Sequence, residues 1–244
     1  MGAMPAASLQ LERVDDGAIA VARLDRPEVR NALDSATIDA LCACLGELAA
    51  DPGLRGLVLS TTSERALCAG ADVGEPLDHA GGVARMEGFA RLYAAVDAFP
   101  APTVCVCVGN VVGAGAELAA GCDLRVGGDN LRLAWAGARV GAPVGPARLA
   151  PLVGLSVAKD WILTGRTIGM EEAAAARFLH RTAPAAEAEA AALDLAREVA
   201  ANDPGGVRTL KAMMRAYERS AERIADENAR LVAFQRDGAG LPRR

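Results

Sequence analysis

The apolar pattern at the start of the chain predicts a hairpin followed by a helix. Apolar runs at residues 9–13 and 18–24 flank the turn sequence Asp-Asp-Gly at 15–17, which is typical of two paired strands. Asp34 then precedes apolar positions at helical spacing, and the Asp-Pro-Gly sequence at 51–53 is expected to end this helix.

The chain up to about residue 126 continues to alternate between strands and helices. Strands are expected at 57–59, 103–108 and 123–126, helices at 81–99 and 113–122, and a loop at 61–76. Such a succession predicts an α/β core with parallel strand pairing.

From Pro146 onward the pattern becomes helical throughout. Helices are expected at 147–152, 156–163, 171–178, 185–201, 207–217 and 221–234. We therefore divide the chain into an α/β core that carries the site, residues 1–145, and a helical region, residues 146–244. The last helix is amphipathic, and its apolar face favours contacts in an oligomer.

Composition excludes several classes of function. The chain has 26 basic and 31 acidic residues, a net charge of −5, and 52% hydrophobic residues. The apolar content excludes a disordered chain, and the acidic balance disfavours a role in binding nucleic acid. We see no run of the roughly 20 apolar residues that a membrane span needs, and no secretory signal at the N-terminus.

Cysteine and histidine usage narrows the chemistry further. The six cysteines show no Cys-x-x-Cys spacing and are interpreted as buried thiols in a reducing cytoplasm. Only His79 and His180 are present, so a histidine-rich metal centre is excluded, and the only lysines are Lys159 and Lys211. The chain has no Gly-x-Ser-x-Gly sequence, the motif that would indicate a serine hydrolase.

Two loops of small residues are the candidate site. Residues 69–72 (AGAD) and 113–117 (GAGAE) each follow a strand, and the second begins a helix. Unhindered amides at a helix N-terminus suit an anion, and two such loops together could form an oxyanion hole. Close packing of the backbone is the alternative explanation for so many small residues.

In combination, four motifs resemble the crotonase (enoyl-CoA hydratase/isomerase) superfamily across nearly the whole chain. They are LDRPEVRNAL at 24–33, LCAGADV at 67–73, GNVVGAGAELAAGCD at 109–123, and LTGR at 163–166 followed by alanines at 173–176. The resemblance implies a spiral of ββα units with a C-terminal helical region. It also implies an acyl-CoA thioester as substrate, without a further cofactor or metal.

The resemblance assigns roles to individual residues. The amides of Ala71 and Ala114 would hold the thioester carbonyl oxygen and stabilise an enolate, and losing one such donor typically costs about 10²–10³ in rate. Lys211 is a second candidate for the coenzyme A phosphates beside Arg26, although either cation could simply be a solvated surface charge. The residues expected to contact substrate are Arg26, Ala69, Gly70, Asp72, Val73 and Gly74.

One catalytic carboxylate is retained and one is absent. Glu117 matches a catalytic glutamate of the hydratases; the alternative is a helix N-terminal acid that stabilises the helix dipole. The second glutamate matches Gly137, and the chain has no Asp or Glu between Asp129 and Asp160. Hydration, which divides its proton transfers between two carboxylates, is therefore not expected to be efficient.

Three interpretations remain open at this stage. The first is an acyl-CoA enzyme with one carboxylate, such as an isomerase, decarboxylase or thioester hydrolase, in which Arg139 could hold a substrate carboxylate. The second is an acyl-CoA-binding or scaffold protein with impaired catalysis, and the third is a weak or unusual hydratase. The resemblance also implies a homotrimer or hexamer, and the cysteine usage without a signal indicates the cytoplasm.

Overall fold

The chain begins with the predicted hairpin. In the computed structural model, which describes residues 8–242, β1 (Leu9–Val14) pairs antiparallel with β2 (Ile19–Leu24). Asp15 and Asp16 adopt positive φ angles of 55° and 56°, a backbone conformation that aspartate tolerates better than most residues. The turn sequence thus fixes the register of the first two strands.

Six strands form the large sheet, in the order β1-β2-β3-β5-β7-β9. Beyond β2 every pairing is parallel, as the alternating pattern predicted. The strands that continue the sheet are β3 (Gly56–Thr61), β5 (Thr103–Cys107), β7 (Leu124–Gly128) and β9 (Arg181–Ala183).

A second, three-stranded parallel sheet accompanies the first. Its strands are β4 (Ala66–Cys68), β6 (Asn110–Val112) and β8 (Arg132–Ala134). The sequence did not predict them because three residues are too few to show an alternating pattern. β4 falls within the segment 61–76 that was predicted to be a loop.

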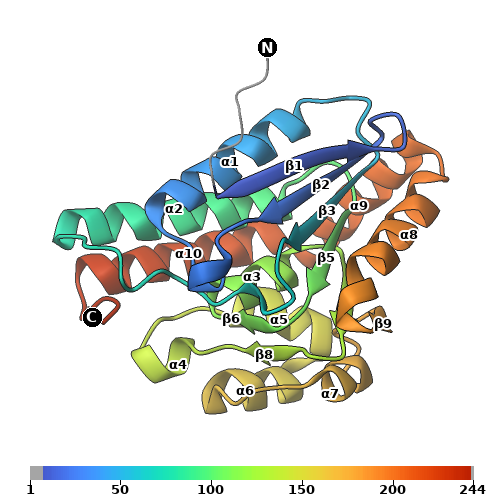
Figure 1. The fold of residues 1–244 in the computed structure, drawn as a ribbon. Helices are drawn as coiled ribbons and strands as arrows, with labels where there is room; N and C mark the ends of the chain where they lie inside the picture. Colours follow the sequence, from blue (N-terminus) through green and yellow to red (C-terminus); the bar gives the residue numbers. More distant parts are fainter. Residues whose placement is uncertain (1–7, 243–244) are drawn as a thin grey trace.

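Successive ββα units build the molecule, which confirms the predicted fold class. Each unit sends one strand to the large sheet, the next strand to the small sheet, and then forms a helix (Figure 1). The helices that close these units are α2 (His79–Asp97), α3 (Ala114–Gly121) and α4 (Gly137–Val140).

The remaining helices surround this core. Asp34 caps the first of them by accepting a hydrogen bond from the Thr37 amide, as its position in the sequence indicated. They are α1 (Ser35–Ala49), α5 (Pro146–Val153), α6 (Leu155–Thr164), α7 (Met170–Ala175), α8 (Ala188–Ala200), α9 (Pro204–Glu218) and α10 (Ser220–Arg236), with short 3₁₀ helices η1 (Pro27–Val29) and η2 (Ala185–Glu187).

Alternation along the strands separates two hydrophobic layers. Val104 and Val106 pack toward α8, whereas Cys105 and Cys107 belong to the larger cluster on the other face of the sheet. The larger cluster includes the apolar faces of α1, α2 and α3. It also includes Cys68 and Ala114, at the two loops that hold the candidate site.

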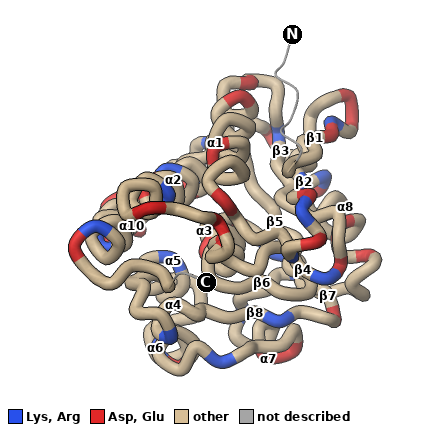
Figure 2. Tube along the Cα trace, turned by 60° about the vertical axis from the view of Figure 1, so that its left-hand side comes forward, with Lys and Arg blue, Asp and Glu red and all other residues tan. Residues whose placement is uncertain are grey.

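The region after residue 146 is not purely helical. β9 joins the large sheet beside β7, and α10 packs along α2 (Figure 1). Ile224 and Leu231, on the apolar face of the last helix that was expected to favour an oligomer, are instead buried within the chain. The division of the chain at residue 145 stays a prediction. Strands from both sides of this position form the large sheet. Lys and Arg are interspersed with Asp and Glu along the trace (Figure 2).

Candidate active site

The two small-residue loops approach each other, as predicted. Gly70, with φ of +109°, lies against the start of α3: a Cβ built on it would be 3.3 Å from the Val112 carbonyl oxygen and 4.0 Å from the Ala114 nitrogen. Gly115 lies still closer to β4, because its Cβ would be 2.4 Å from the Cys68 carbonyl oxygen. Glycine is therefore required where these backbones meet.

The amides of Ala71 and Ala114 have no acceptor among the described residues. Three of the four neighbouring amides have acceptors: the Gly70 amide donates to Cys68 Sγ, that of Asp72 to the Leu33 carbonyl, and that of Gly113 to the Ala134 carbonyl. Ala114 is the first residue of α3, where an amide has no partner within the helix. Two donors are therefore available at the point where the loops meet.

Both alanines line a largely apolar pocket of about 170 Å³. Ala69, Gly70 and Val73, which were predicted to contact substrate, line it as well. The other lining residues are Met86, Phe89, Tyr93, Val112, Gly113, Ala136, Gly137, Val140, Ala142, Val144, Leu231, Leu241 and Pro242. The pocket thus combines an apolar wall with two backbone donors.

Asp72 and Gly74, also predicted as substrate contacts, form a turn instead. The Gly74 amide donates to Asp72 Oδ1 at 3.0 Å, and neither residue lines the pocket. The second carboxylate oxygen of Asp72 faces the Arg26 guanidinium.

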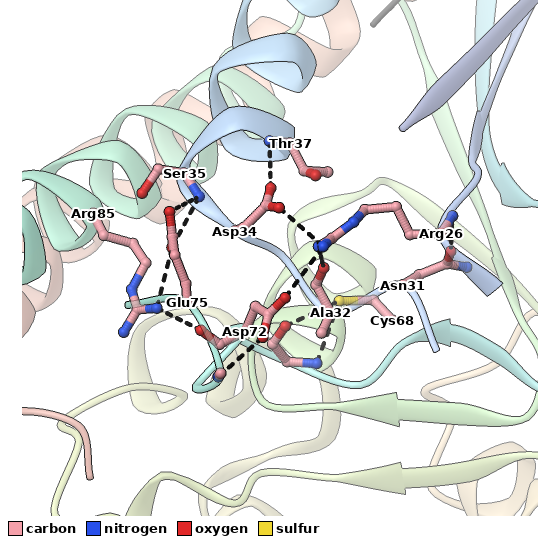
Figure 3. Close-up of polar contacts among 12 residues, drawn as sticks. Arg26, Asn31, Ala32, Asp34, Ser35, Thr37, Cys68, Asp72, Glu75 and Arg85 are labelled. Carbon is pink, nitrogen blue, oxygen red and sulfur yellow. Dashed lines mark hydrogen bonds and ion pairs between the residues drawn. The ribbon is translucent and has the colours of Figure 1, made fainter. Parts of the chain in front are cut away.

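Arg26 contacts the loop of residues 69–74 through Asp72 (Figure 3). Its guanidinium donates to the Ala32 carbonyl and contacts Asp34 at 3.0 Å and Asp72 at 3.3 Å. It does not line the pocket. The structure therefore gives Arg26 other partners than the coenzyme A phosphates that the resemblance implied.

A second arginine, Arg85, also contacts this loop (Figure 3). The sequence did not indicate this contact. Buried Arg85, on α2, donates to the Asp72 carbonyl at 2.6 Å and contacts Glu75 at 3.3 Å. Glu75 in turn accepts from the Ser35 amide at the start of α1. The loop is thus fixed to two helices before any ligand arrives.

Glu117 lies in a buried network behind the pocket. Its side chain has no exposed surface, Trp135 Nε1 donates to Oε1 at 2.7 Å, and Arg148 Nη1 donates to Oε2 at 2.7 Å. The Arg148 guanidinium also binds Glu227 and Asn228 on α10. Glu117 does not line the pocket, so in this arrangement its carboxylate does not face a substrate.

Burial dominates the electrostatics of this network. It raises the pKa of Glu117 to about 7, and the neighbouring Glu227 carboxylate adds to the rise. The positive charge of Arg148 is the largest effect that lowers this pKa, and the hydrogen bonds from Arg148 and Trp135 lower it further, but burial outweighs them. The protonated and ionised forms of Glu117 are therefore both populated near neutral pH.

Gly137 leaves no room for the missing carboxylate. A Cβ at this position would be 2.6 Å from the Ala142 carbonyl oxygen and 3.0 Å from Val144 Cγ2. The Ala142 amide also donates to the Gly137 carbonyl at 2.9 Å. The loop 141–145 has closed over the place where a side chain would lie.

The other titratable candidates lie away from the pocket. Lys211 Nζ donates to Asp123 at 2.6 Å and to the Ala101 carbonyl, and Arg139 is exposed. His180 accepts from the Arg125 amide, and burial lowers the pKa of His180 to about 4, so its imidazole is neutral. Among the described residues, no cluster of His, Cys, Asp or Glu is placed to hold a metal ion.

Comparison with known proteins identifies the family of the chain. Residues 15–237 match the model of the enoyl-CoA hydratase/isomerase family. The chain is 36% identical over 213 residues to a putative enoyl-CoA hydratase of Thermus thermophilus, covering 83% of this chain and 82% of the relative. It is 34% identical over 199 residues to the putative enoyl-CoA hydratase/isomerase YngF of Bacillus subtilis, covering 79% and 76%.

Solved structures show the same fold. An enoyl-CoA hydratase/isomerase from Xanthobacter autotrophicus Py2 superposes with a TM-score of 0.85 at 23% identity, over 96% of this chain and 89% of that one. Pseudomonas aeruginosa DspI superposes with a TM-score of 0.83 at 26% identity, over 93% and 95%. The chain belongs to the enoyl-CoA hydratase/isomerase (crotonase) family of enzymes, as its four motifs indicated. No helix in the part of the chain that is described combines the length and apolarity needed to cross a bilayer.

Proposed function

We propose that this protein binds an acyl-CoA thioester and polarises its carbonyl group between the amides of Ala71 and Ala114. The observation that carries the proposal is that both amides lack an acceptor among residues 8–242 and both lie at one apolar pocket. Family membership supplies the thioester class. Coenzyme A enters as part of the substrate, and the proposed chemistry uses no other cofactor.

In this proposal, charge stabilisation is the main catalytic device. When a bond at the α-carbon breaks heterolytically, negative charge moves to the carbonyl oxygen, and two fixed amides stabilise it without reorganising. The N-terminus of α3 adds a partial positive charge at the same place. The contacts that Arg26 and Arg85 make with the loop hold the two donors in position before a ligand binds.

Proton transfer is the part of hydratase chemistry that this site does not support. Gly137 has no side chain, and the Glu117 carboxylate is enclosed by Trp135 and Arg148. For Glu117 to reach a thioester, one of these bonds must break and the side chain must turn. We therefore propose a reaction other than hydration, within the group of isomerisation, decarboxylation and thioester hydrolysis. Glu117 is structural in this proposal, so the protons that these reactions remove or add are exchanged with water in the pocket and not with a side chain.

An acyl-CoA-binding protein with impaired catalysis is the second candidate. It is favoured by one observation, that no carboxylate lines the pocket in the described chain. The two functions share the binding step and differ only in turnover.

A panel of thioesters separates these functions. Crotonyl-CoA, 3-hexenoyl-CoA, malonyl-CoA and butyryl-CoA are titrated by calorimetry, with free coenzyme A as control, and products are followed by mass spectrometry. The enzyme proposal expects binding of thioesters and a product other than the hydrated acyl group. Binding without any product favours the second candidate, rapid hydration of crotonyl-CoA contradicts both, and absence of binding refutes the thioester assignment itself.

We further propose a homotrimer or hexamer in the cytoplasm. The exposed apolar residues of α9 support an oligomer, because they recur at helical spacing: Leu210, Met213, Met214 and Tyr217. All six cysteines are free thiols, which suits a reducing compartment. Sedimentation velocity of the wild type and of Met214→Glu tests the oligomer: the substitution should shift the protein toward monomer, and a wild-type monomer contradicts it.

A further inference from the structure

Tyr93 is the one pocket-lining residue in the described chain whose side chain carries an N–H or O–H group. It lies on α2 and is only 4% exposed. Its ring stacks on Phe89, with centroids 5.7 Å apart, and the Arg148 guanidinium lies 4.5 Å from its centroid. The ring is thus fixed on both sides, and the position of its hydroxyl is fixed with it.

The Tyr93 hydroxyl has no hydrogen-bond partner among the described residues, although nearly all of the residue is buried. Three side-chain atoms are completely buried without a partner: Thr37 Oγ1, Arg85 Nε and Arg148 Nε. The Tyr93 hydroxyl is not among them, so it keeps some accessible surface. An enclosed hydroxyl without a partner is unfavourable. A hydroxyl on a residue that lines the pocket can be satisfied by a group that enters the pocket.

The surroundings keep this hydroxyl in its neutral form. Burial raises the pKa of Tyr93 well above its ordinary value, and the Glu117 carboxylate behind the ring adds to the rise. Giving up its proton would leave a phenolate beside that carboxylate. The group is therefore suited to donate a hydrogen bond rather than to transfer a proton.

The chemistry of the pocket selects the kind of acceptor. A carboxylate on the ligand would bring a charge into a pocket without a lining cation, so this inference removes decarboxylation from the proposed group of reactions. A ligand hydroxyl would bring a second proton, for which the other lining side chains offer no oxygen or nitrogen. A ketone oxygen needs one donor and brings no proton, so it matches what Tyr93 offers.

We infer that Tyr93 is a specificity-determining residue, whose hydroxyl donates a hydrogen bond to a second, neutral carbonyl oxygen on the acyl group. The inference rests on the proposed function, since it takes the thioester carbonyl to lie at Ala71 and Ala114. It assigns the substrate to the oxoacyl thioesters. A site built to bond such an oxygen discriminates against the analogue without it, because the donor is then left unpaired.

The test compares matched ligands on matched variants. Calorimetry measures the affinity of acetoacetyl-CoA against butyryl-CoA, and of 4-oxopentanoyl-CoA against pentanoyl-CoA. The variants are Tyr93→Phe, which keeps the ring and removes only the hydroxyl, and Tyr217→Phe, the same change on α9 outside the pocket, which keeps the ring proposed for the oligomer contact. Thermal unfolding should be unchanged in both variants, because neither hydroxyl has a described partner in the chain.

The wild type should prefer at least one oxoacyl ligand by about tenfold, the order expected for one hydrogen bond. Tyr93→Phe should lose this preference while binding the plain acyl ligands as before, and Tyr217→Phe should keep it. Equal binding of both ligand types, or a preference that persists in Tyr93→Phe, overturns the role of Tyr93 and leaves the proposed function in place. Malonyl-CoA binding more tightly than acetoacetyl-CoA overturns the choice of a neutral oxygen, and no binding of any thioester overturns the proposed function as well.

Discussion

Replacing Glu117 by glutamine tests whether this carboxylate is structural. Glutamine keeps the shape of the side chain but does not titrate, so it removes the ionisation that burial opposes. In the wild type the pKa of Glu117 rises from its ordinary 4.5 to about 7. The folded state then holds its proton over a pH range in which the unfolded chain has lost it.

The sign and size of the effect follow from proton linkage. Because the folded-state pKa is raised, the stabilising contribution is complete below pH 4.5 and is lost as pH rises toward 7. One pKa unit corresponds to about 1.4 kcal/mol, so the loss across this window is about 3 kcal/mol. For a chain of this length that is a change of about 6–12 °C in Tm.

Urea unfolding at a series of pH values from 4.5 to 8 measures the difference between the wild type and Glu117→Gln. The free energy of unfolding of the wild type, relative to the variant, should fall by about 3 kcal/mol between pH 4.5 and 7 and then level off. Glu47→Gln is the control, because Glu47 is exposed on α1 and has no ion-pair partner among the described residues. Its difference from the wild type should be flat.

Two results would refute this reasoning. A difference that is flat, or that grows with pH, means that the ion pair with Arg148 outweighs burial. The structural role also requires that Glu117→Gln retain butyryl-CoA affinity and any turnover found in the panel. Loss of turnover with normal binding would instead assign Glu117 to proton transfer.

Three further substitutions probe the loops. Gly137→Glu should lower Tm and restore no hydration of crotonyl-CoA, because its Cβ meets the Ala142 carbonyl at 2.6 Å; a gain of hydratase activity contradicts the closed loop. Gly115→Ala should abolish calorimetric binding of butyryl-CoA and destabilise by about 1–3 kcal/mol in urea unfolding, since the methyl group would lie 2.4 Å from the Cys68 carbonyl oxygen; unchanged binding counts against the loop geometry. Arg26→Gln should cost about 2 kcal/mol in urea unfolding, by removing charged hydrogen bonds to the loop, and should weaken thioester affinity at every salt concentration. If the effect on affinity disappears at high salt, Arg26 contacts the coenzyme A phosphates, as the resemblance implied.

The sequence predicted those features that depend on local pattern. The hairpin, α1 and α3 follow from turn residues, capping and helical spacing, and the strands of the large sheet are long enough to show an apolar run. β4, β6 and β8 have three residues each and leave no such signal. The positions of Ala71 and Ala114 were predictable because their motifs place them.

The partners of Glu117 were not predictable from spacing. Trp135, Arg148 and Glu227 are 18, 31 and 110 residues further along the chain, and packing alone brings them together. In the sequence, an acidic residue beside a small-residue loop indicates proton transfer. The sequence does not show whether the carboxylate faces a pocket or an arginine. The absence of acids between Asp129 and Asp160 was the one available signal that the pocket lacks a second carboxylate.

We propose that a thioester oxygen lies between the amides of Ala71 and Ala114. Difference infrared spectroscopy of butyryl-CoA labelled with ¹³C at the carbonyl measures this directly. Ala114→Pro removes one donor at the first residue of α3, where proline is tolerated, and Leu155→Pro is the matched control at the first residue of α6, also after a glycine with positive φ. We expect the bound carbonyl band to move to lower wavenumber in the wild type and in Leu155→Pro, and to move much less in Ala114→Pro; a band that stays at its free position on binding would contradict the oxyanion hole.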